Sequence, residues 1–240
     1  MLKKSRKVVA LGLAATVAFA GVAMATSADD NDAGVIGNVA PKKLPKLKYK
    51  PIALKLGVTN SNNWITGTQQ NPETELIRLS KNIRVNLAKA PRCSEEFGNG
   101  TPVDFARDQC PPRSYLGGGN GEVTAPGPTP LPIEKIAVMN GPGKNEVQLV
   151  TESSALGAGA PTIPGKIVGA NKRGYGKALR VNAPETGALL ITKFQATLLK
   201  ARRVVTARCK PRKIKFQRNV TYKDGSSESV TKTMRCKVKR

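Results

Sequence analysis

The amino-acid sequence predicts an all-β protein, an antiparallel β-sandwich of Ig-like or jelly-roll-like type with two disulfides and little helix. Three observations support this prediction. Apolar and polar residues alternate along several segments, glycine and proline clusters separate those segments, and four cysteines follow a segment typical of exported chains. Alternation with a period of two is typical of strands with one buried face, and many short strands separated by turns are typical of sandwiches.

The strongest alternation runs from Ile77 to Leu87. Every odd position in this segment is apolar except Lys81, and every even position is polar. A helix would scatter these residues around its circumference, whereas a strand places all odd positions on one face. We therefore predict a single strand over residues 77–87 whose odd face lies in the core.

Further apolar or alternating segments follow towards the C-terminus. They predict strands at residues 133–140, 147–152, 163–170, 178–183 and 189–199. The segments 213–222 and 227–238 flank Asp224-Gly225, a dipeptide that tolerates positive φ, and therefore predict a hairpin. We interpret the glycines between 117 and 121 as flexible strand or turn residues, and we expect a helical turn or two between 95 and 109.

The first 25 residues predict a signal peptide. Four cationic residues precede an apolar run over residues 8–23, and Ala23-Met24-Ala25 supplies the small-x-small pattern that signal peptidase recognises. The run is too short to cross a bilayer comfortably, so we expect no transmembrane span and a secreted or cell-envelope-associated protein. An uncleaved amphipathic anchor is the alternative.

Two further regions complete the predicted domain organisation. Residues 26–50 predict a disordered N-terminal arm, because they lack a periodic apolar pattern and become rich in lysine and proline. Prolines at positions 41, 45 and 51 favour an extended chain. We assign residues 51–240 to a single β-sandwich domain.

The four cysteines are Cys93, Cys110, Cys209 and Cys236. An even count in an exported chain predicts two disulfides, for which three connectivities are possible. We favour Cys93–Cys110 and Cys209–Cys236, because each of these pairs closes a short loop within one segment. A tetrathiolate zinc site would need close pairs such as C-x-x-C, which the sequence lacks.

Four short motifs stand out together in this chain. They are Cys93, the segment 110–119 (CPPRSYLGGG), Asn140-Gly141, and Cys209 with Asp224-Gly225-Ser226 and Cys236. Together they resemble the pattern of a family of uncharacterised exported proteins of actinobacteria, which has a cysteine, a C-P-x-[K/R]-S-x-[V/L]-G-x-G segment, a central Asn-Gly and a C-terminal C…D-G-S…C hairpin. This chain is more basic than the pattern requires. The resemblance covers about residues 50–240 and implies a secreted β-rich domain with two disulfides, but no activity.

Catalytic patterns are weak in this sequence. It contains no histidine, which removes the usual general base, the commonest metal ligand and the third member of most nucleophilic triads. An S-x-x-K match at Ser229–Lys232 lies in the predicted hairpin, where residues three apart point to opposite faces. The acidic pairs at 95–96 and at Asp104 and Asp108 leave a carboxylate-dependent extracellular hydrolase as the alternative. We expect a non-enzymatic protein without a cofactor or metal site.

Positive charge is concentrated towards the C-terminus. Residues 189–240 contain sixteen Lys and Arg against two acidic residues, Asp224 and Glu228. Our candidate polyanion-binding residues on this hairpin are Lys213, Lys215, Lys232 and Arg235. Such a surface attracts anionic envelope polymers or lipid headgroups through charge alone, and the few aromatic residues argue against nucleic-acid recognition, so we expect no sequence-specific nucleic-acid partner. A cationic surface that serves solubility alone, or a structural envelope component without a ligand, are the alternatives.

Overall fold

The computed structural model describes residues 34–60, 72–124, 129–157, 160–182 and 190–239. Within these residues the chain forms one eleven-stranded sheet, two small sheets, one α-helix and two 3-10 turns. The predicted signal peptide over residues 1–25 lies outside the described residues. No helix among the described residues has the length and apolar character needed to cross a membrane.

The eleven strands of the main sheet are all paired antiparallel. In hydrogen-bonded order they are β1 (Gly34–Ala40), β4 (Ala53–Thr59), β12 (Leu190–Leu198), β7 (Tyr115–Thr124), β8 (Pro130–Asn140), β9 (Glu146–Glu152), β10 (Thr162–Gly169), β11 (Tyr175–Asn182), β5 (Pro72–Ser80), β14 (Lys213–Tyr222) and β15 (Ser227–Arg235).

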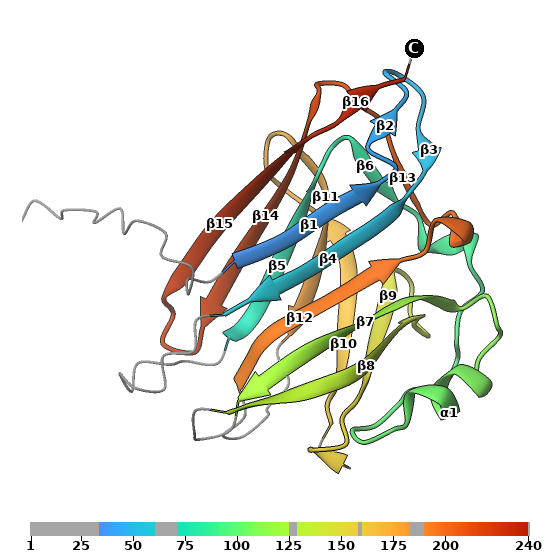
Figure 1. The fold of residues 1–240 in the computed structure, drawn as a ribbon, viewed down its shortest axis with the longest axis vertical. Helices are drawn as coiled ribbons and strands as arrows, with labels where there is room; N and C mark the ends of the chain where they lie inside the picture. The colour runs from blue at the N-terminus through green and yellow to red at the C-terminus, as the bar shows by residue number, and fades with distance from the viewer. Residues whose placement is uncertain (1–33, 61–71, 125–128, 158–159, 183–189, 240) are drawn as a thin grey trace, which may run out of the picture.

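This sheet curls so strongly that its two ends meet: β1 lies against both β14 and β15 (Figure 1). A side chain at Gly37 of β1 would overlap the ring of Phe216 on β14, so glycine permits this close approach. The all-β, antiparallel prediction is confirmed. The two halves of the sheet face each other across one core. Hydrogen bonding joins each strand to the next along the whole order, from β1 at one end to β15 at the other. The sheet is therefore a nearly closed barrel.

Two small sheets cover one end of the curled sheet. The first contains β3 (Lys50–Pro51), β13 (Val205–Ala207) and β6 (Ile83–Val85), and the second pairs β2 (Lys43–Leu44) with β16 (Lys237–Val238) in parallel. The helix α1 (Val103–Asp108) falls inside the segment where helical turns were predicted, and the 3-10 turns are η2 (Leu87–Lys89) and η4 (Lys200–Arg202). Both predicted disulfides, Cys93–Cys110 and Cys209–Cys236, are present.

The strand predicted over residues 77–87 is wrong as a single element. β5 ends at Ser80, a turn follows, and β6 begins at Ile83. Asn82 causes the break: its buried Nδ2 donates to the carbonyl oxygens of Pro211 and Lys213 at 3.2 and 3.1 Å, which anchors the turn to a distant segment. The odd face is nevertheless confirmed as core, since Ile77, Leu79, Ile83 and Leu87 are all buried.

The disordered arm predicted over residues 26–50 is also wrong for residues 34–50. β1 pairs with β4 along its whole length and buries Val35 and Val39. Only three inward positions, Val35, Gly37 and Val39, carry this pattern, which is too short to be recognised beside the acidic and lysine-rich residues around it. The other predicted strands match β8 to β12, β14 and β15, whereas β7 was recognised only as a glycine segment of strand or turn.

Candidate functional site

The interior of the curled sheet contains an apolar cavity. Its volume is about 110 Å³, several times the roughly 10–15 Å³ that one buried water needs, so the space is of ligand size. Its walls come from both halves of the sheet, with β4 and β12 facing β5, β9, β10 and β11.

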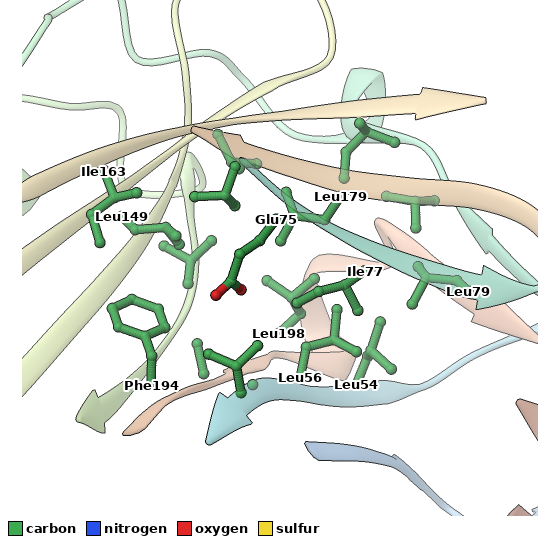
Figure 2. Close-up of a pocket in the computed structure, with 18 of the residues that line it drawn as sticks. Leu54, Leu56, Glu75, Ile77, Leu79, Leu149, Ile163, Leu179, Phe194 and Leu198 are labelled. Atoms are coloured by element: carbon green, nitrogen blue, oxygen red, sulfur yellow. The ribbon is translucent and has the colours of Figure 1, made fainter. Parts of the chain in front are cut away.

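The side chains that line the cavity are almost all aliphatic (Figure 2). Several of them are only partly buried although they point inward, among them Leu56, Leu179, Phe194 and Leu198. Protein interiors are normally packed as densely as organic crystals, so inward-pointing side chains with remaining exposure indicate unfilled space. The interior is therefore preformed and apolar, which is typical of small-molecule sites.

One charged residue, Glu75, lines this cavity among the described residues. The alternation of β5 places Glu75 on the same face as Ile77 and Leu79, and Figure 2 shows its carboxylate directed into the space bounded by Phe194 and Leu56. Its Oε1 lies 2.5 Å from Nη2 of Arg218. The two side chains are 12% and 1% exposed, so this is a buried ion pair.

Arg218 reaches Glu75 from the inner face of β14, where it stands between Phe216 and Val220. Its Nη1 donates to the carbonyl oxygen of Thr59 at 3.0 Å, and its Nη2 also donates to Oδ1 of Asn60 at 2.6 Å. These acceptors lie at the end of β4, across the region where the two ends of the sheet meet. Arg218 therefore joins β14 to β4 and holds Glu75 at the cavity.

Tyr222 lies beside this ion pair at the end of β14. Burial, followed by the charge and the hydrogen bond of Glu228, raises the pKa of Tyr222 to about 12. The positive charge of Arg218 opposes this shift, and the negative charge of Glu75 adds to it. At neutral pH the phenol of Tyr222 is therefore uncharged.

The four candidate polyanion residues do not share one face. Lys213 and Arg235 are directly opposed on the outer face of the β14–β15 hairpin, and Lys215 lies on the same face opposite Thr233. Lys232 is opposed to Phe216, which points into the core, so Lys232 lies on the other side of the sheet at its exposed edge. The structure therefore brings together three of the four residues.

The two lysine-rich parts of the sequence lie side by side where β2 pairs with β16 (Figure 1), and their exposed side chains form a larger basic surface. The β2–β16 pairing places Lys43 beside Lys237, and the amide of Cys209 donates to the carbonyl oxygen of Pro45 at 2.9 Å. We call this surface the basic pole; its exposed residues are Lys42, Lys43, Lys46, Lys48, Lys50, Arg84, Lys210, Arg212, Lys213, Arg235, Lys237 and Lys239. None of them forms an ion pair with a described carboxylate.

Asp104 and Glu134, two carboxylates that share a groove, do not favour the hydrolase alternative. Asp104 and Glu134 line one shallow groove, where Lys135 lowers the pKa of Asp104 and a hydrogen bond from Ser154 lowers the pKa of Glu134. A glycosidase needs one carboxyl group whose pKa is raised, so that it can donate a proton. Asp104 instead pairs with Lys135 at 3.0 Å and helps to dock α1 on β8.

The structure also bears on the S-x-x-K match and on the potential metal ligands. Ser229 and Lys232 lie on opposite sides of β15, and Oγ of Ser229 accepts a hydrogen bond from Gln217. No group of three or more potential metal ligands gathers among the described residues.

Sequence reasoning missed the cavity and both of its charged residues. A signal was present in the alternation: Glu75 shares its parity with Ile77 and Leu79, and Arg218 shares the inward parity of Phe216 and Val220. A charge at an inward position of an otherwise apolar strand face predicts a buried pair or a site. No protein-family model matches the sequence, and no curated protein is found to be similar to it.

Proposed function

We propose that this protein is an exported, non-enzymatic binding protein that holds a small apolar molecule inside its curled sheet. The observation that supports this function is the unfilled apolar interior, with its inward-pointing and partly buried side chains. The two disulfides are compatible with export, because disulfides persist in oxidising compartments.

Binding of an apolar molecule in this cavity is favoured by the hydrophobic effect. Each Å² of apolar surface removed from water contributes roughly 25 cal/mol, and a preformed cavity requires little rearrangement of the protein. An apolar cavity offers water few hydrogen bonds, so an apolar ligand displaces little that is favourable. Rigid strands from both halves of the sheet hold the walls in place before binding.

The test is binding of the fluorescent apolar probe N-phenyl-1-naphthylamine to the purified protein. Ala196 lines the cavity on the inner face of β12, and Thr197 lies next to it on the outer face. Ala196→Phe should abolish probe binding while unfolding no more easily than the wild type, because the new ring fills empty space. Thr197→Phe adds a ring to the outer face and should bind the probe normally.

The opposite result would contradict the proposal. If Ala196→Phe binds the probe as the wild type does, the cavity is not the binding site. Should that variant fail to fold, Leu56→Phe provides a second, smaller increase in volume at the cavity wall.

A second function, the binding of anionic envelope polymers, is favoured by the basic pole. Twelve exposed cationic side chains gather there without a described carboxylate partner, and Lys213 stands directly opposite Arg235. Like charges in directly opposed positions repel each other, and a bound polyanion would relieve that repulsion. Retention on immobilised polyphosphate and on heparin at low and high salt tests this function. Equal retention of the wild type and a Lys213→Glu/Lys215→Glu/Arg235→Glu variant would contradict it.

A further inference from the structure

We infer that the molecule held in the cavity is a neutral amphiphile with one hydroxyl group, which donates a hydrogen bond to Glu75. This inference rests on the proposed function of the cavity and adds the chemical class of its ligand. It follows from the orientation of the Glu75 carboxylate, from the positive charge of Arg218, and from the hydrogen bonds that already engage both terminal nitrogens of Arg218.

The Glu75 carboxylate offers the cavity a hydrogen-bond acceptor. Its Oε1 is bound by Arg218, and no described residue donates a hydrogen bond to its Oε2. Figure 2 shows the carboxylate pointing into the cavity among apolar side chains. A carboxylate that faces apolar side chains favours a ligand that brings a hydrogen-bond donor to this position, since such a ligand gains a charge-assisted hydrogen bond there.

The sum of charges at this site selects against ionised ligands. Glu75 and Arg218 together are neutral, and the other described residues that line the cavity are uncharged. A carboxylate ligand would place a second negative charge beside Glu75. An ammonium ligand would leave a net positive charge in apolar surroundings, because Arg218 already neutralises Glu75. A hydroxyl group supplies the donor without either cost.

Arg218 is not free to bind an acidic ligand. Its two terminal nitrogens are engaged by Thr59, Asn60 and Glu75, and the residue does not line the cavity. Its Nε has no described hydrogen-bond partner, but this atom is buried away from solvent. The guanidinium therefore fixes the position and charge of Glu75, and Glu75 is the group that meets the ligand.

Three probes with the same eight-carbon chain test the ligand class. Calorimetric titration at pH 7.5 should show that 1-octanol binds at least tenfold more tightly than octanoate or octylammonium. Glu75→Gln should reverse the ranking of 1-octanol and octanoate, since the charge of Arg218 is then uncompensated and attracts the carboxylate. Glu73→Gln removes the same charge two residues away on β5, where the side chain is exposed, and should keep the wild-type ranking.

The outcomes separate this inference from the proposed function. If N-phenyl-1-naphthylamine binds but octanoate binds as tightly as 1-octanol, the cavity is a site and the inferred ligand class is wrong. If neither the fluorescent probe nor any eight-carbon probe binds, both proposals fall. Should Glu75→Gln not fold, the ranking of the three probes on the wild type still decides the ligand class.

Discussion

The cavity and the basic pole lie at different places on one curled sheet. Charge beside the cavity is buried and paired, whereas charge at the basic pole is exposed and without described carboxylate partners. In the interior a single arginine, Arg218, is 1% exposed, and its terminal nitrogens have three acceptors. At the basic pole twelve exposed cationic side chains have no described carboxylate partner. The comparison teaches that burial, more than the number of charges, decides how much any one of them matters.

The physical basis is the surrounding dielectric. A charge in an apolar interior has strong interactions and a high cost when its partner is lost. An exposed charge is solvated and screened within about 10 Å at 0.1 M salt, so each contributes little alone. We therefore expect the cavity to be selective and insensitive to salt, and the basic pole to be unselective and strongly dependent on salt.

The largest expected effect follows the loss of Arg218. Arg218→Met should lower the free energy of unfolding by about 3–5 kcal/mol, because it leaves Glu75 buried without its partner. The double variant Arg218→Met/Glu75→Leu should regain much of this loss, since both charges are then absent. Urea denaturation of the three proteins measures the differences.

Arg180→Met is the matched control for this experiment. Arg180 is exposed on β11, and its replacement should change the free energy of unfolding by no more than about 0.5 kcal/mol. A double variant as unstable as Arg218→Met would show that the hydrogen bonds to Thr59 and Asn60, and not the ion pair, stabilise this region.

The next largest effect is the loss of stability expected when either disulfide is removed. Cys209–Cys236 closes a loop of the C-terminal basic segment over a separation of 27 residues, and replacing both cysteines with alanine should cost about 3.5 kcal/mol by loop-closure entropy. The same replacement at Cys93–Cys110, with a separation of 17 residues, should cost about 3 kcal/mol.

Binding measurements on these two variants sharpen the comparison. Loss of Cys209–Cys236 should weaken retention on polyphosphate and leave N-phenyl-1-naphthylamine binding intact, because the cavity is lined by other strands. Loss of Cys93–Cys110 should leave both properties intact. Equal weakening of polyphosphate retention in the two variants would argue against a binding surface organised by the second disulfide.

Salt should produce a smaller effect that distinguishes the two faces of the last hairpin. Each cationic contact to a polyanion contributes about 0.7–0.9 to the slope of log affinity against log salt. Lys213→Gln/Arg235→Gln should therefore reduce the slope for polyphosphate by about 1.5. Lys232→Gln, on the other side of the sheet, should leave the slope unchanged. A change in slope for Lys232→Gln would mean that the charges act without regard to face.

Much of the fold could be predicted from the sequence, because period-two alternation directly reports a strand with one buried face. The hairpin of β14 and β15, the buried odd positions from Ile77 to Leu87 and both disulfides follow from such local patterns. The break at Asn82 could not be predicted, since it depends on carbonyl groups of residues 211 and 213 that are close only in space.

The candidate site was not predicted for a similar reason. Glu75 and Arg218 are 143 positions apart, and only the β5–β14 pairing together with the curl of the sheet makes them neighbours. Empty volume is likewise a property of packing between distant strands and leaves no local pattern. The basic pole was predicted only in part. Both lysine-rich segments can be identified in the sequence, but their proximity depends on the β2–β16 pairing.

The smallest expected effect is the titration of Tyr222, which interacts with the Glu75–Arg218 ion pair. Its pKa is raised to about 12 by burial and by Glu228, whereas an unfolded tyrosine titrates near 10. The folded state therefore holds this proton more tightly, so the contribution of Tyr222 to stability is complete below about pH 10 and is lost as the pH rises towards 12. Absorbance titration near 295 nm should show a late phenol, and Tyr222→Phe should remove it. In Glu228→Gln this phenol should titrate earlier, because the neighbouring negative charge is gone. If Tyr222→Phe leaves the late part of the titration curve unchanged, the burial of Tyr222 beside the ion pair is contradicted.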